Sequence, residues 1–224
     1  MIVTALVVAK APVPGLAKTR LAATIGDAAA ADLAAASLLD TLDAVRSADV
    51  AHRVVALTGN LADAARADEL TRALASFTVI AQRGDQLGER LANAHSDATT
   101  TGAVLQIGMD TPQVTAQMLS DAAARLDDGD VLGPAEDGGW WALGLRDPAL
   151  ARALLDVPMS APSTGVDTHA ALTAAGASIM PLAELRDVDF ETDLDPVCRV
   201  CPPAGRFRMA VEKMRSKRDS ESVL

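Results

Sequence analysis

The sequence has no tyrosine, and aromatic residues make up only 2% of its 224 positions. Proteins that bind single-stranded nucleic acid without reading its sequence stack the bases on aromatic side chains, so this composition argues against that class. Positive charge is scarce as well, because the sequence has 20 Lys and Arg against 30 Asp and Glu, which gives a formal net charge of −10. A surface for duplex DNA needs a basic field. We therefore expect no nucleic-acid partner.

Long apolar runs and a cysteine framework are also missing. The amino-terminal stretch MIVTALVVAKAPVP is apolar over too few residues for a membrane span and has no basic leader, which predicts a cytoplasmic protein without a membrane span. The two cysteines, Cys198 and Cys201, form a single C-x-x-C pair, and the histidines are scattered. A zinc site needs more ligands at matched spacing, so we expect two reduced thiols without a role.

Apolar content is plentiful, because 50% of the residues are hydrophobic, and it predicts one large core. Strands are expected at residues 2–9, 53–58, 77–81, 103–107, 131–133, 141–145 and 178–181. Amphipathic helices are expected at residues 27–46, 61–74, 87–98, 115–126 and 166–175. This alternation predicts an α/β fold with helices on both faces of a mostly parallel sheet. The strands near 131–145 leave no room for a crossover helix, so the sheet is predicted to be partly mixed.

We expect the chain to form a single domain over residues 1–197. The remaining segment, residues 198–224, becomes basic and then polar. It is predicted to be a carboxyl-terminal extension that is partly helical and has a disordered end.

The first segment that could carry chemistry is AKAPVPGLAKTRL, residues 9–21. Its prolines and glycine predict an extended loop that does not fold into helix. Lys10, Lys18 and Arg20 concentrate positive charge there, and the loop after the first strand of an α/β sheet often holds phosphates. Neither a dinucleotide fingerprint nor a P-loop is present. The alternative is a surface loop with solvated lysines, but the concentration of cations favours phosphate binding.

The second segment is QRGDQLGERLANA, residues 82–94. Gly84 and Gly88 would let the backbone approach a flat ligand, and Gln82 offers an amide edge that suits a nucleobase. A glycine-containing loop between a strand and a helix explains the segment equally well.

The third segment is VLQIGMDTPQVT, residues 104–115. An apolar strand runs up to Gly108, Asp110 follows at its end, and Thr115 is expected to cap the next helix. Asp-Thr-Pro is good turn chemistry. The sharper interpretation is a metal ligand at the carboxyl edge of a parallel sheet, where open α/β folds bind their ligands.

The fourth segment is GPAEDGGWWALGL, residues 133–145. Glu136 and Asp137 stand beside Gly138, Gly139 and Trp140, a combination that suits a sugar or alcohol acceptor stacked on the indole and hydrogen-bonded to carboxylates. A tight hairpin with an inward tryptophan is an equally good explanation.

The fifth segment, LRDVDFETDLDP, residues 185–196, is rich in carboxylates. Asp189, flanked by Val188 and Phe190, has the character of another acid at a strand end. Asp193 and Asp195 are interpreted as turn and capping residues.

Taken in order, these segments resemble small bacterial GT-A-fold proteins of the nucleotide-diphospho-sugar transferase or arsenosugar-biosynthesis-type glycosyltransferase kind. That family carries A-K-x-P-x-P-G-x-x-K-T-R-L, R-G-x-x-L-G-x-R, G-x-D-x-P, G-P-A-x-D-G-G and a late D-x-D. The chain matches them at residues 9–21, 83–90, 108–112, 133–139 and 187–189. Nucleotidyltransferases that make molybdenum-cofactor guanine dinucleotide or activated phospholactate are more distant relatives. Met109-Asp110-Thr111 stands where Ser-Asp-Ser is common in the family, a departure that leaves the ligand Asp110 in place. Trp140-Trp141 stands where a Tyr pair is common, and this departure leaves the identity of the acceptor open.

The resemblance implies a three-layer Rossmann-like GT-A fold and assigns a role to each segment. Lys18 and Arg20 would hold the nucleotide phosphates, and with Asp137, which would face the acceptor, they form the expected catalytic set. Mg²⁺ or Mn²⁺ would be held by Asp110 and Asp189. The expected nucleotide-binding residues are Ala9, Lys10, Gly15, Lys18, Arg20, Gln82, Arg83, Gly84, Leu87 and Gly88, and the expected acceptor-binding residues are Glu136, Asp137, Gly138, Gly139 and Trp140.

The function predicted in this way is a metal-dependent transferase that uses a nucleotide or nucleotide-sugar donor and a small-molecule acceptor. Glycosyl transfer is favoured, and nucleotidyl transfer onto a phosphorylated metabolite, as in the guanylyltransferases, is the alternative. A regulatory protein that binds nucleotide without turnover is the rival from another class. The oligomeric state is open, with a homodimer among the alternatives.

Overall fold

The structure is a computed structural model that describes residues 1–99 and 101–222. Seven strands form one sheet in the order β3-β2-β1-β4-β6-β5-β7. Strand β6 runs antiparallel to β4 and β5, and the other neighbouring pairs are parallel. The strands are β1 (Val3–Lys10), β2 (His52–Thr58), β3 (Thr78–Ala81), β4 (Ala103–Ile107), β5 (Asp130–Pro134), β6 (Trp140–Leu145) and β7 (Ile179–Pro181). The predicted mostly parallel, partly mixed α/β fold is confirmed.

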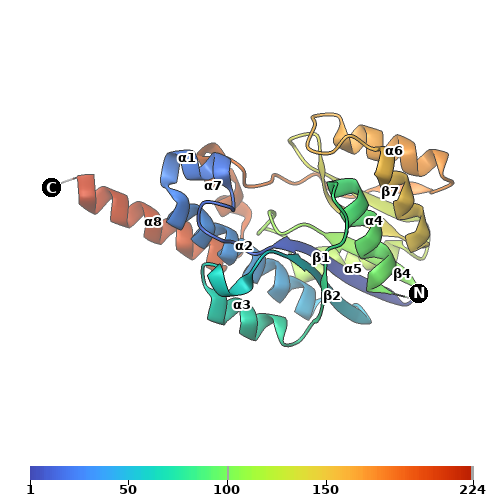
Figure 1. The fold of residues 1–224 in the computed structure, drawn as a ribbon, viewed down its shortest axis with the longest axis horizontal. Coiled ribbons are helices and arrows are strands. Elements are labelled where there is room, and N and C mark those ends of the chain that lie inside the picture. The colour runs from blue at the N-terminus through green and yellow to red at the C-terminus, as the bar shows by residue number, and fades with distance from the viewer. Residues whose placement is uncertain (100, 223–224) are drawn as a thin grey trace.

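Helices cover both faces of this sheet and make three layers (Figure 1). One apolar core joins the sheet to α2, α3 and α5, and smaller clusters join the other face to α4, α6 and η2. The helices are α1 (Thr19–Ile25), α2 (Asp27–Ser47), α3 (Ala67–Leu74), α4 (Leu87–Ala98), α5 (Ala116–Arg125), α6 (Thr164–Ala174), α7 (Glu191–Val200) and α8 (Arg206–Ser222), with 3₁₀ turns η1 (Leu61–Asp63) and η2 (Pro148–Asp156).

Alternation along the strands explains which side each residue faces. In β1, Val3, Ala5 and Val7 pack into the core with α2, while Leu6 packs into the cluster on the opposite face. Successive side chains of a strand point to opposite faces. A central strand buried on both sides therefore shows the nearly unbroken apolar run from which it was predicted.

Local chemistry sets several boundaries that differ from the expected ones. The loop after β1 was expected to reach residue 21, but α1 begins at Thr19, directly after Lys18 in the left-handed conformation at φ 49°. The helix expected at 61–74 is divided, because Arg66 is also left-handed at φ 53° and separates η1 from α3. Thr115 caps α5 as predicted, since its side chain accepts a hydrogen bond from the Met118 amide.

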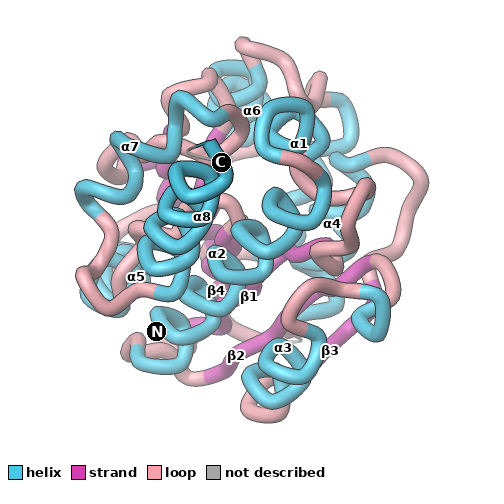
Figure 2. Tube along the Cα trace, turned by 90° about the vertical axis from the view of Figure 1, so that its left-hand side faces the viewer, coloured by secondary structure: helices cyan, strands magenta, loops and turns pink. Residues whose placement is uncertain are grey.

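A second group of helices stands beside the sheet and forms what we call the helical lobe, made of α1, the first half of α2, α7 and α8. Its own apolar cluster includes Leu21, Leu33, Leu194 and Phe207, all fully or almost fully buried. Figure 2, which views the molecule from this side, shows α1, α7 and α8 in front of the strands. Residues at the start of α1 line a cavity together with Asp110, so the lobe provides one side of that cavity.

The expected division at residue 197 falls inside this lobe. Helix α7 runs from Glu191 to Val200, across the expected boundary, and α8 packs along α2. A helix covers most of the expected extension, and residues 223–224, where a disordered end was predicted, lie outside the described residues. Within the described chain, no helix has the length and apolar character that crossing a membrane requires.

Candidate functional site

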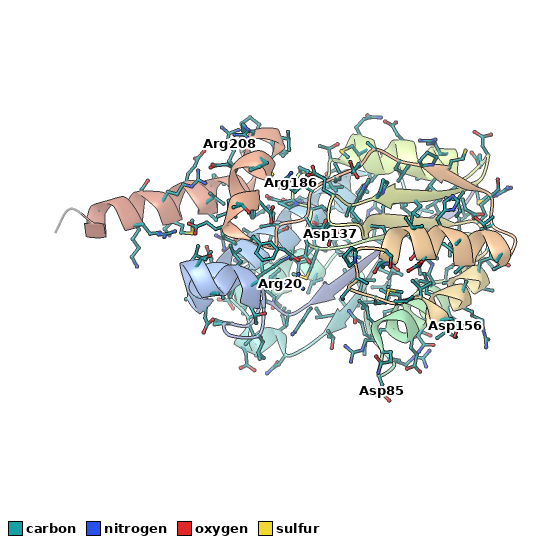
Figure 3. The ribbon with its side chains drawn as sticks, turned by 90° about the horizontal axis from the view of Figure 1, so that it is seen from above. Arg20, Asp85, Asp137, Asp156, Arg186 and Arg208 are labelled. Carbon is teal, nitrogen blue, oxygen red and sulfur yellow. The ribbon has the colours of Figure 1, made fainter. Side chains whose placement is uncertain are left out.

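The candidate site lies where the helical lobe meets the carboxyl edge of the sheet. Figure 3 shows Arg20, Asp137 and Arg186 gathered there, whereas Asp85 and Asp156 lie at the periphery. Two adjoining cavities open at this position, of about 340 Å³ and about 300 Å³. Asp110 and Met109 line both of them. Open α/β sheets bind ligands at this edge, so the location agrees with the expectation from sequence.

The lobe side of the site is a network of cations around one carboxylate, which we call the cation wall: Lys18, Arg20 and Asp189. The Lys18 ammonium donates to Asp189 Oδ1 at 2.8 Å and lies 3.0 Å from Asp110 Oδ1. Arg20 donates to the other oxygen, Asp189 Oδ2, at 3.1 Å, and its guanidinium lies over the Phe190 ring. Asp189 is thus neutralised from two sides.

The pKa values of this wall follow from burial and charge pairing. Burial opposes the charged form of Lys18, but Asp110 and Asp189 outweigh it and raise the pKa of the ammonium. Burial alone would raise the pKa of Asp189, yet Lys18 and Arg20 outweigh it and hold that pKa below its usual value. Lys18 and Asp189 are therefore both charged at neutral pH.

The sheet side of the site is a group of acids, which we call the carboxylate wall: Asp110, Asp137 and Asp187. Asp110 follows β4, Asp137 stands in the turn between β5 and β6, and Asp187 follows β7. All three line the smaller cavity. The Val188 amide donates to the Asp110 carbonyl at 3.1 Å, and the Gln113 side chain donates to the Arg186 carbonyl at 2.8 Å. These bonds fix the segment that carries Asp187 beside the end of β4.

Asp187 is a site residue to which the sequence analysis gave no role, although it begins the D-x-D pair. Its Oδ1 is buried and has no hydrogen-bond partner among the described residues. Burial, and then the nearby charges of Asp110 and Asp137, raise the pKa of Asp187 to about 7. Buried polar atoms are almost always paired, so this oxygen is the strongest sign of an external partner. The signal in the sequence that could have identified Asp187 was its place two residues before Asp189 in the D-x-D pattern.

The turn that carries Asp137 has both characters that the sequence left open. It is tight, because Gly138 has φ 89° and the Gly139 amide donates to Asp137 Oδ1 at 2.8 Å. It also faces the smaller cavity, which Asp137, Gly139 and Trp140 line. The Trp140 indole is fixed by its bond to Thr168 at 3.1 Å. Glu136 pairs instead with Arg186, and this ion pair lies outside the residues that line the cavity.

The segment expected to line the nucleobase is largely occupied with structural contacts. The Gln82 amide donates at 2.9 Å to the carbonyls of Ala9 and Ala56 and so ties the loop after β3 to two strands. Arg83 forms a two-bond pair with Asp97. A Cβ on Gly88 would meet the Leu154 carbonyl at 2.3 Å.

Other residues of that segment and of the loop after β1 differ in their access to the cavities. Gly84 has φ 120° in its turn, and Gly15 has φ 77° in the loop after β1. Leu87 lines the smaller cavity, and Lys10 lines the larger one, where its ammonium donates to the Leu16 carbonyl. The nucleotide-binding roles of these residues stay predictions.

The oxygen atoms of the carboxylate wall fit a hard divalent cation. Mg²⁺ is typically bound through one or two carboxylates together with substrate phosphates, and Asp187 Oδ1 is a buried oxygen without a partner. Within the described ranges, no group of three or more His, Cys, Asp or Glu side chains is assembled to hold a metal ion by itself.

The cysteine pair lies away from this site, in the helical lobe. Cys198 and Cys201 are both free, and Cys201 is buried in the apolar cluster of the lobe. Burial raises the pKa of Cys198 and raises that of Cys201 to about 12. Thiols in this state are poor nucleophiles.

A protein family matches the central part of the chain. The family is described as uncharacterized protein conserved in bacteria (DUF2064), and it matches residues 41–161, which is more than half of the chain. This stretch contains Asp110 and Asp137, whereas the loop after β1 and the Asp187–Asp189 pair lie outside it. A search of the curated proteins finds no match.

Solved structures resemble the chain along almost its whole length. A protein from Desulfovibrio desulfuricans G20, provisionally described as a nucleotide-diphospho-sugar transferase, matches with a TM-score of 0.81 at 23% identity and covers 98% of this chain and 96% of its own. CMP:2-keto-3-deoxy-manno-octonic acid synthetase complexed with CTP matches with a TM-score of 0.57 at 14% identity, over 95% of this chain and 100% of its own.

A third match is Rv0371C from Mycobacterium tuberculosis H37Rv, solved in complex with manganese. Its TM-score is 0.54 at 16% identity, and the match covers 88% of this chain and 98% of that chain. At such identities these likenesses establish the fold, which is that of nucleotide-diphospho-sugar transferases and nucleotidyltransferases.

Proposed function

The chain belongs to the family of uncharacterized proteins conserved in bacteria (DUF2064), and we propose that it is a metal-dependent transferase that uses a nucleotide donor. Its reaction in this proposal is glycosyl transfer from a nucleotide-diphospho-sugar to a small acceptor. The observation that carries the proposal is the meeting of two unlike walls at the carboxyl edge of the sheet. Lys18 and Arg20 stand on one side, and the partnerless Asp187 Oδ1 stands on the other with Asp110 and Asp137.

The cation wall is proposed to hold the donor's phosphates. Phosphate oxygens favour lysine and arginine, and the arginine fork binds two oxygens at once. Lys10, Lys18 and Arg20 all line the cavity of about 340 Å³. Asp189 positions Lys18 and Arg20 there, because each of them donates to a different oxygen of its carboxylate.

The carboxylate wall is proposed to hold the metal, with Asp110 and Asp187 as the protein ligands. Asp189, the second ligand expected from sequence, already pairs with Lys18 and Arg20, whereas Asp187 has an unpartnered oxygen. When bound, Mg²⁺ or Mn²⁺ would neutralise the negative charge that develops on the leaving phosphate. A relative of the same fold was solved with manganese, which supports the choice of ion.

Asp137 is proposed to face the acceptor. Its Oδ1 is held by the Gly139 amide at 2.8 Å, which orients the carboxylate, and both it and Trp140 line the cavity next to Asp110. A carboxylate in this position can accept the proton of an attacking hydroxyl group, provided that the acceptor lies within hydrogen-bond reach. The ring of Trp140 offers an apolar face on which a sugar can rest.

Glycosyl transfer and nucleotidyl transfer break different bonds. In glycosyl transfer the acceptor attacks the sugar carbon, the bond between that carbon and the phosphate oxygen breaks, and a nucleoside diphosphate leaves. In nucleotidyl transfer a phosphorylated acceptor attacks the α-phosphorus of a nucleoside triphosphate, and pyrophosphate leaves. The sugar-transferase likeness has the higher TM-score, 0.81 against 0.57, and this favours the first reaction. The finer resemblance to arsenosugar-type glycosyltransferases belongs to the same proposal.

The experiment incubates the protein with panels of nucleotide sugars and of nucleoside triphosphates, each with and without Mn²⁺, and identifies the leaving group. We expect a nucleoside diphosphate to be released in the presence of Mn²⁺ and an acceptor. Release of pyrophosphate would replace glycosyl transfer with nucleotidyl transfer. Tight nucleotide binding without any leaving group would show a binding protein and reject the enzyme.

A further inference from the structure

The ammonium of Lys18 lies between carboxylates of both walls. Its nitrogen is 3.0 Å from Asp110 Oδ1 and 2.8 Å from Asp189 Oδ1, and only 10% of the side chain is exposed. In the part of the chain that the structure describes, Lys18 is the only cation that forms an ion pair with Asp110. One positive charge therefore satisfies two carboxylates, and for Asp110 it has no substitute.

Asp189 differs from Asp110 in this respect. Arg20 donates to its second oxygen at 3.1 Å, so Asp189 would keep a cationic partner if Lys18 moved away. Asp110 would keep none, and it stands beside Asp187, whose Oδ1 has no partner. If Lys18 moved away, two neighbouring carboxylates, Asp110 and Asp187, would therefore have no cationic partner.

We infer that Lys18 competes with a divalent ion for Asp110 and is a positioning residue that couples metal entry to phosphate binding. Its ammonium keeps a divalent ion from Asp110 until a phosphate group draws the ammonium away. Asp110 then becomes free to bind the ion together with Asp187. The inference rests on the proposed function, because it concerns the order in which the metal and the donor's phosphates enter the same site.

The surroundings of Lys18 allow this exchange. Lys18 precedes α1 with a left-handed backbone at φ 49° and ψ 48°, an uncommon conformation for a residue with a side chain. Such outliers cluster at ligand clamps. Its long stem carries a compact point charge that can turn toward a new anion. Lys10 and Arg20 line the same cavity, so a phosphate there would attract Lys18 into an existing group of cations.

The exchange makes a thermodynamic prediction that does not depend on activity. If Lys18 competes with the metal, removal of its charge strengthens the binding of Mn²⁺ alone. In this variant pyrophosphate has no ammonium to draw away from Asp110, so it promotes Mn²⁺ binding less than in the wild type, which is a smaller coupling free energy between the two ligands. We expect Lys18→Met to bind Mn²⁺ alone about tenfold more tightly than the wild type, which corresponds to ~1.4 kcal/mol.

The measurement is the free Mn²⁺ concentration by electron paramagnetic resonance, with the full-length protein, in the absence and presence of inorganic pyrophosphate. The control is Lys10→Met, which removes the same charge from the same cavity. The Lys10 ammonium donates to the Leu16 carbonyl and forms no ion pair with Asp110 or Asp189. It therefore reports the effect of the general electrostatic field, for which we expect a change of less than about threefold.

A larger gain in the binding of Mn²⁺ alone for Lys18→Met than for Lys10→Met supports the inference, and so does a larger fall in the pyrophosphate effect for Lys18→Met than for Lys10→Met. Equal gains in both variants, or no gain in either, overturn it while leaving the metal site intact. If the wild type binds no Mn²⁺ even with pyrophosphate, the proposed metal dependence fails and the inference fails with it. Lys18→Gln, which keeps a polar group beside the carboxylates, provides the same comparison if Lys18→Met does not fold.

Discussion

The two walls of the site hold similar numbers of charged groups but differ in how far their carboxylates are paired with cations. In the cation wall, each carboxylate oxygen of Asp189 meets a cation, and the pKa of that carboxyl is lowered. In the carboxylate wall, Asp187 has an unpaired oxygen, and burial beside other acids raises its pKa to about 7. Both oxygens of Asp189 in the first wall are paired with cations, whereas the second wall holds an unpaired oxygen.

The difference follows from where each wall stands in the fold. The cation wall is supported by the helical lobe, where Val188 is buried among Leu21 and Leu194 and Arg20 reaches solvent with 62% of its side chain exposed. The residues of the carboxylate wall follow β4, β5 and β7, and one backbone bond, from the Val188 amide to the Asp110 carbonyl, joins two of these segments. A set of oxygens positioned in this way is favourable for a ligand that must be bound in one geometry.

The largest expected effect comes from Asp110→Asn, which tests whether the carboxylate wall needs its charge. Asparagine keeps the oxygen that Lys18 contacts at 3.0 Å, so the fold should survive. A hard cation needs the lost charge, and its stabilisation of the transition state is worth several kcal/mol. We expect transfer activity to fall by at least ~100-fold, measured with Mn²⁺ titrated against wild type.

The companion variant is Asp189→Asn in the cation wall. It should weaken pyrophosphate binding through Lys18 and Arg20, while Mn²⁺ binding in the presence of saturating pyrophosphate is largely retained. If Asp189→Asn abolishes Mn²⁺ binding and Asp110→Asn does not, the assignment of the two walls is reversed.

The next effect concerns His95 and the pH dependence of stability. His95 is fully buried, and its Nε2 lies 3.0 Å from Oε1 of Gln106, a residue that lines the smaller cavity. Burial lowers the pKa of His95 to about 4, against an ordinary value of ~6.5 in the unfolded chain. Above pH ~6.5 the imidazole is neutral in both states and contributes no pH dependence.

As the pH falls from ~6.5 toward 4, His95 binds a proton in the unfolded chain but not in the folded protein, so the free energy of unfolding decreases across this window. The loss reaches about 3 kcal/mol near pH 4 and then levels off. Urea denaturation of wild type and His95→Gln at several pH values measures it as a difference between the two proteins. Parallel pH profiles for the two proteins would show that His95 is not the group responsible.

Much of this arrangement could be predicted from the sequence. The strands and most helices carry their period in the apolar residues, and the site motifs fall where those strands end. Asp110 and Asp137 could be assigned to one edge because parallel strands bring their carboxyl ends together. The turn at 137–139 could not be decided, since an Asx-type bond from Gly139 to Asp137 and a cavity-facing side chain coexist there.

The parts that could not be predicted depend on tertiary contacts. Helix α7 was missed because Asp193 and Asp195 were interpreted as turn and capping residues without a helix to cap, yet Asp193 Oδ2 accepts from the Phe190 amide at 2.8 Å and starts the helix. Gly88 suggested room for a nucleobase, but the space left by its missing side chain is filled by the Leu154 carbonyl. Asp187 and Asp189 have the same chemistry in sequence, and the pairing of Lys18 and Arg20 with Asp189 distinguishes them in the structure.

A smaller effect is expected from Asp187→Asn, which should raise stability but weaken metal binding. Asp187 combines a buried, unpartnered oxygen with neighbouring negative charges, and removal of such a charge relieves both desolvation and repulsion. We expect the metal-free protein to gain ~1 kcal/mol, or about 2–4 °C in melting temperature. Mn²⁺ binding in the presence of pyrophosphate should be lost. A variant that melts earlier and still binds Mn²⁺ would show that Asp187 is structural.

The smallest effect on stability is expected from Arg20→Ala, which tests how independent the cation wall is of the fold. Arg20 is mostly exposed, and ion pairs of this kind contribute ~0–1 kcal/mol to folding. The melting temperature should therefore stay nearly unchanged, while pyrophosphate affinity drops by about three- to tenfold because one of its charge-assisted contacts is lost. The matched control is Arg46→Ala, which removes an exposed ion pair with Asp43 at the end of α2. Both variants should melt alike, and only Arg20→Ala should bind pyrophosphate more weakly. Unfolding of Arg20→Ala alone would make the cation wall part of the scaffold, and its resting pairs with Asp189 would then serve the fold before any ligand.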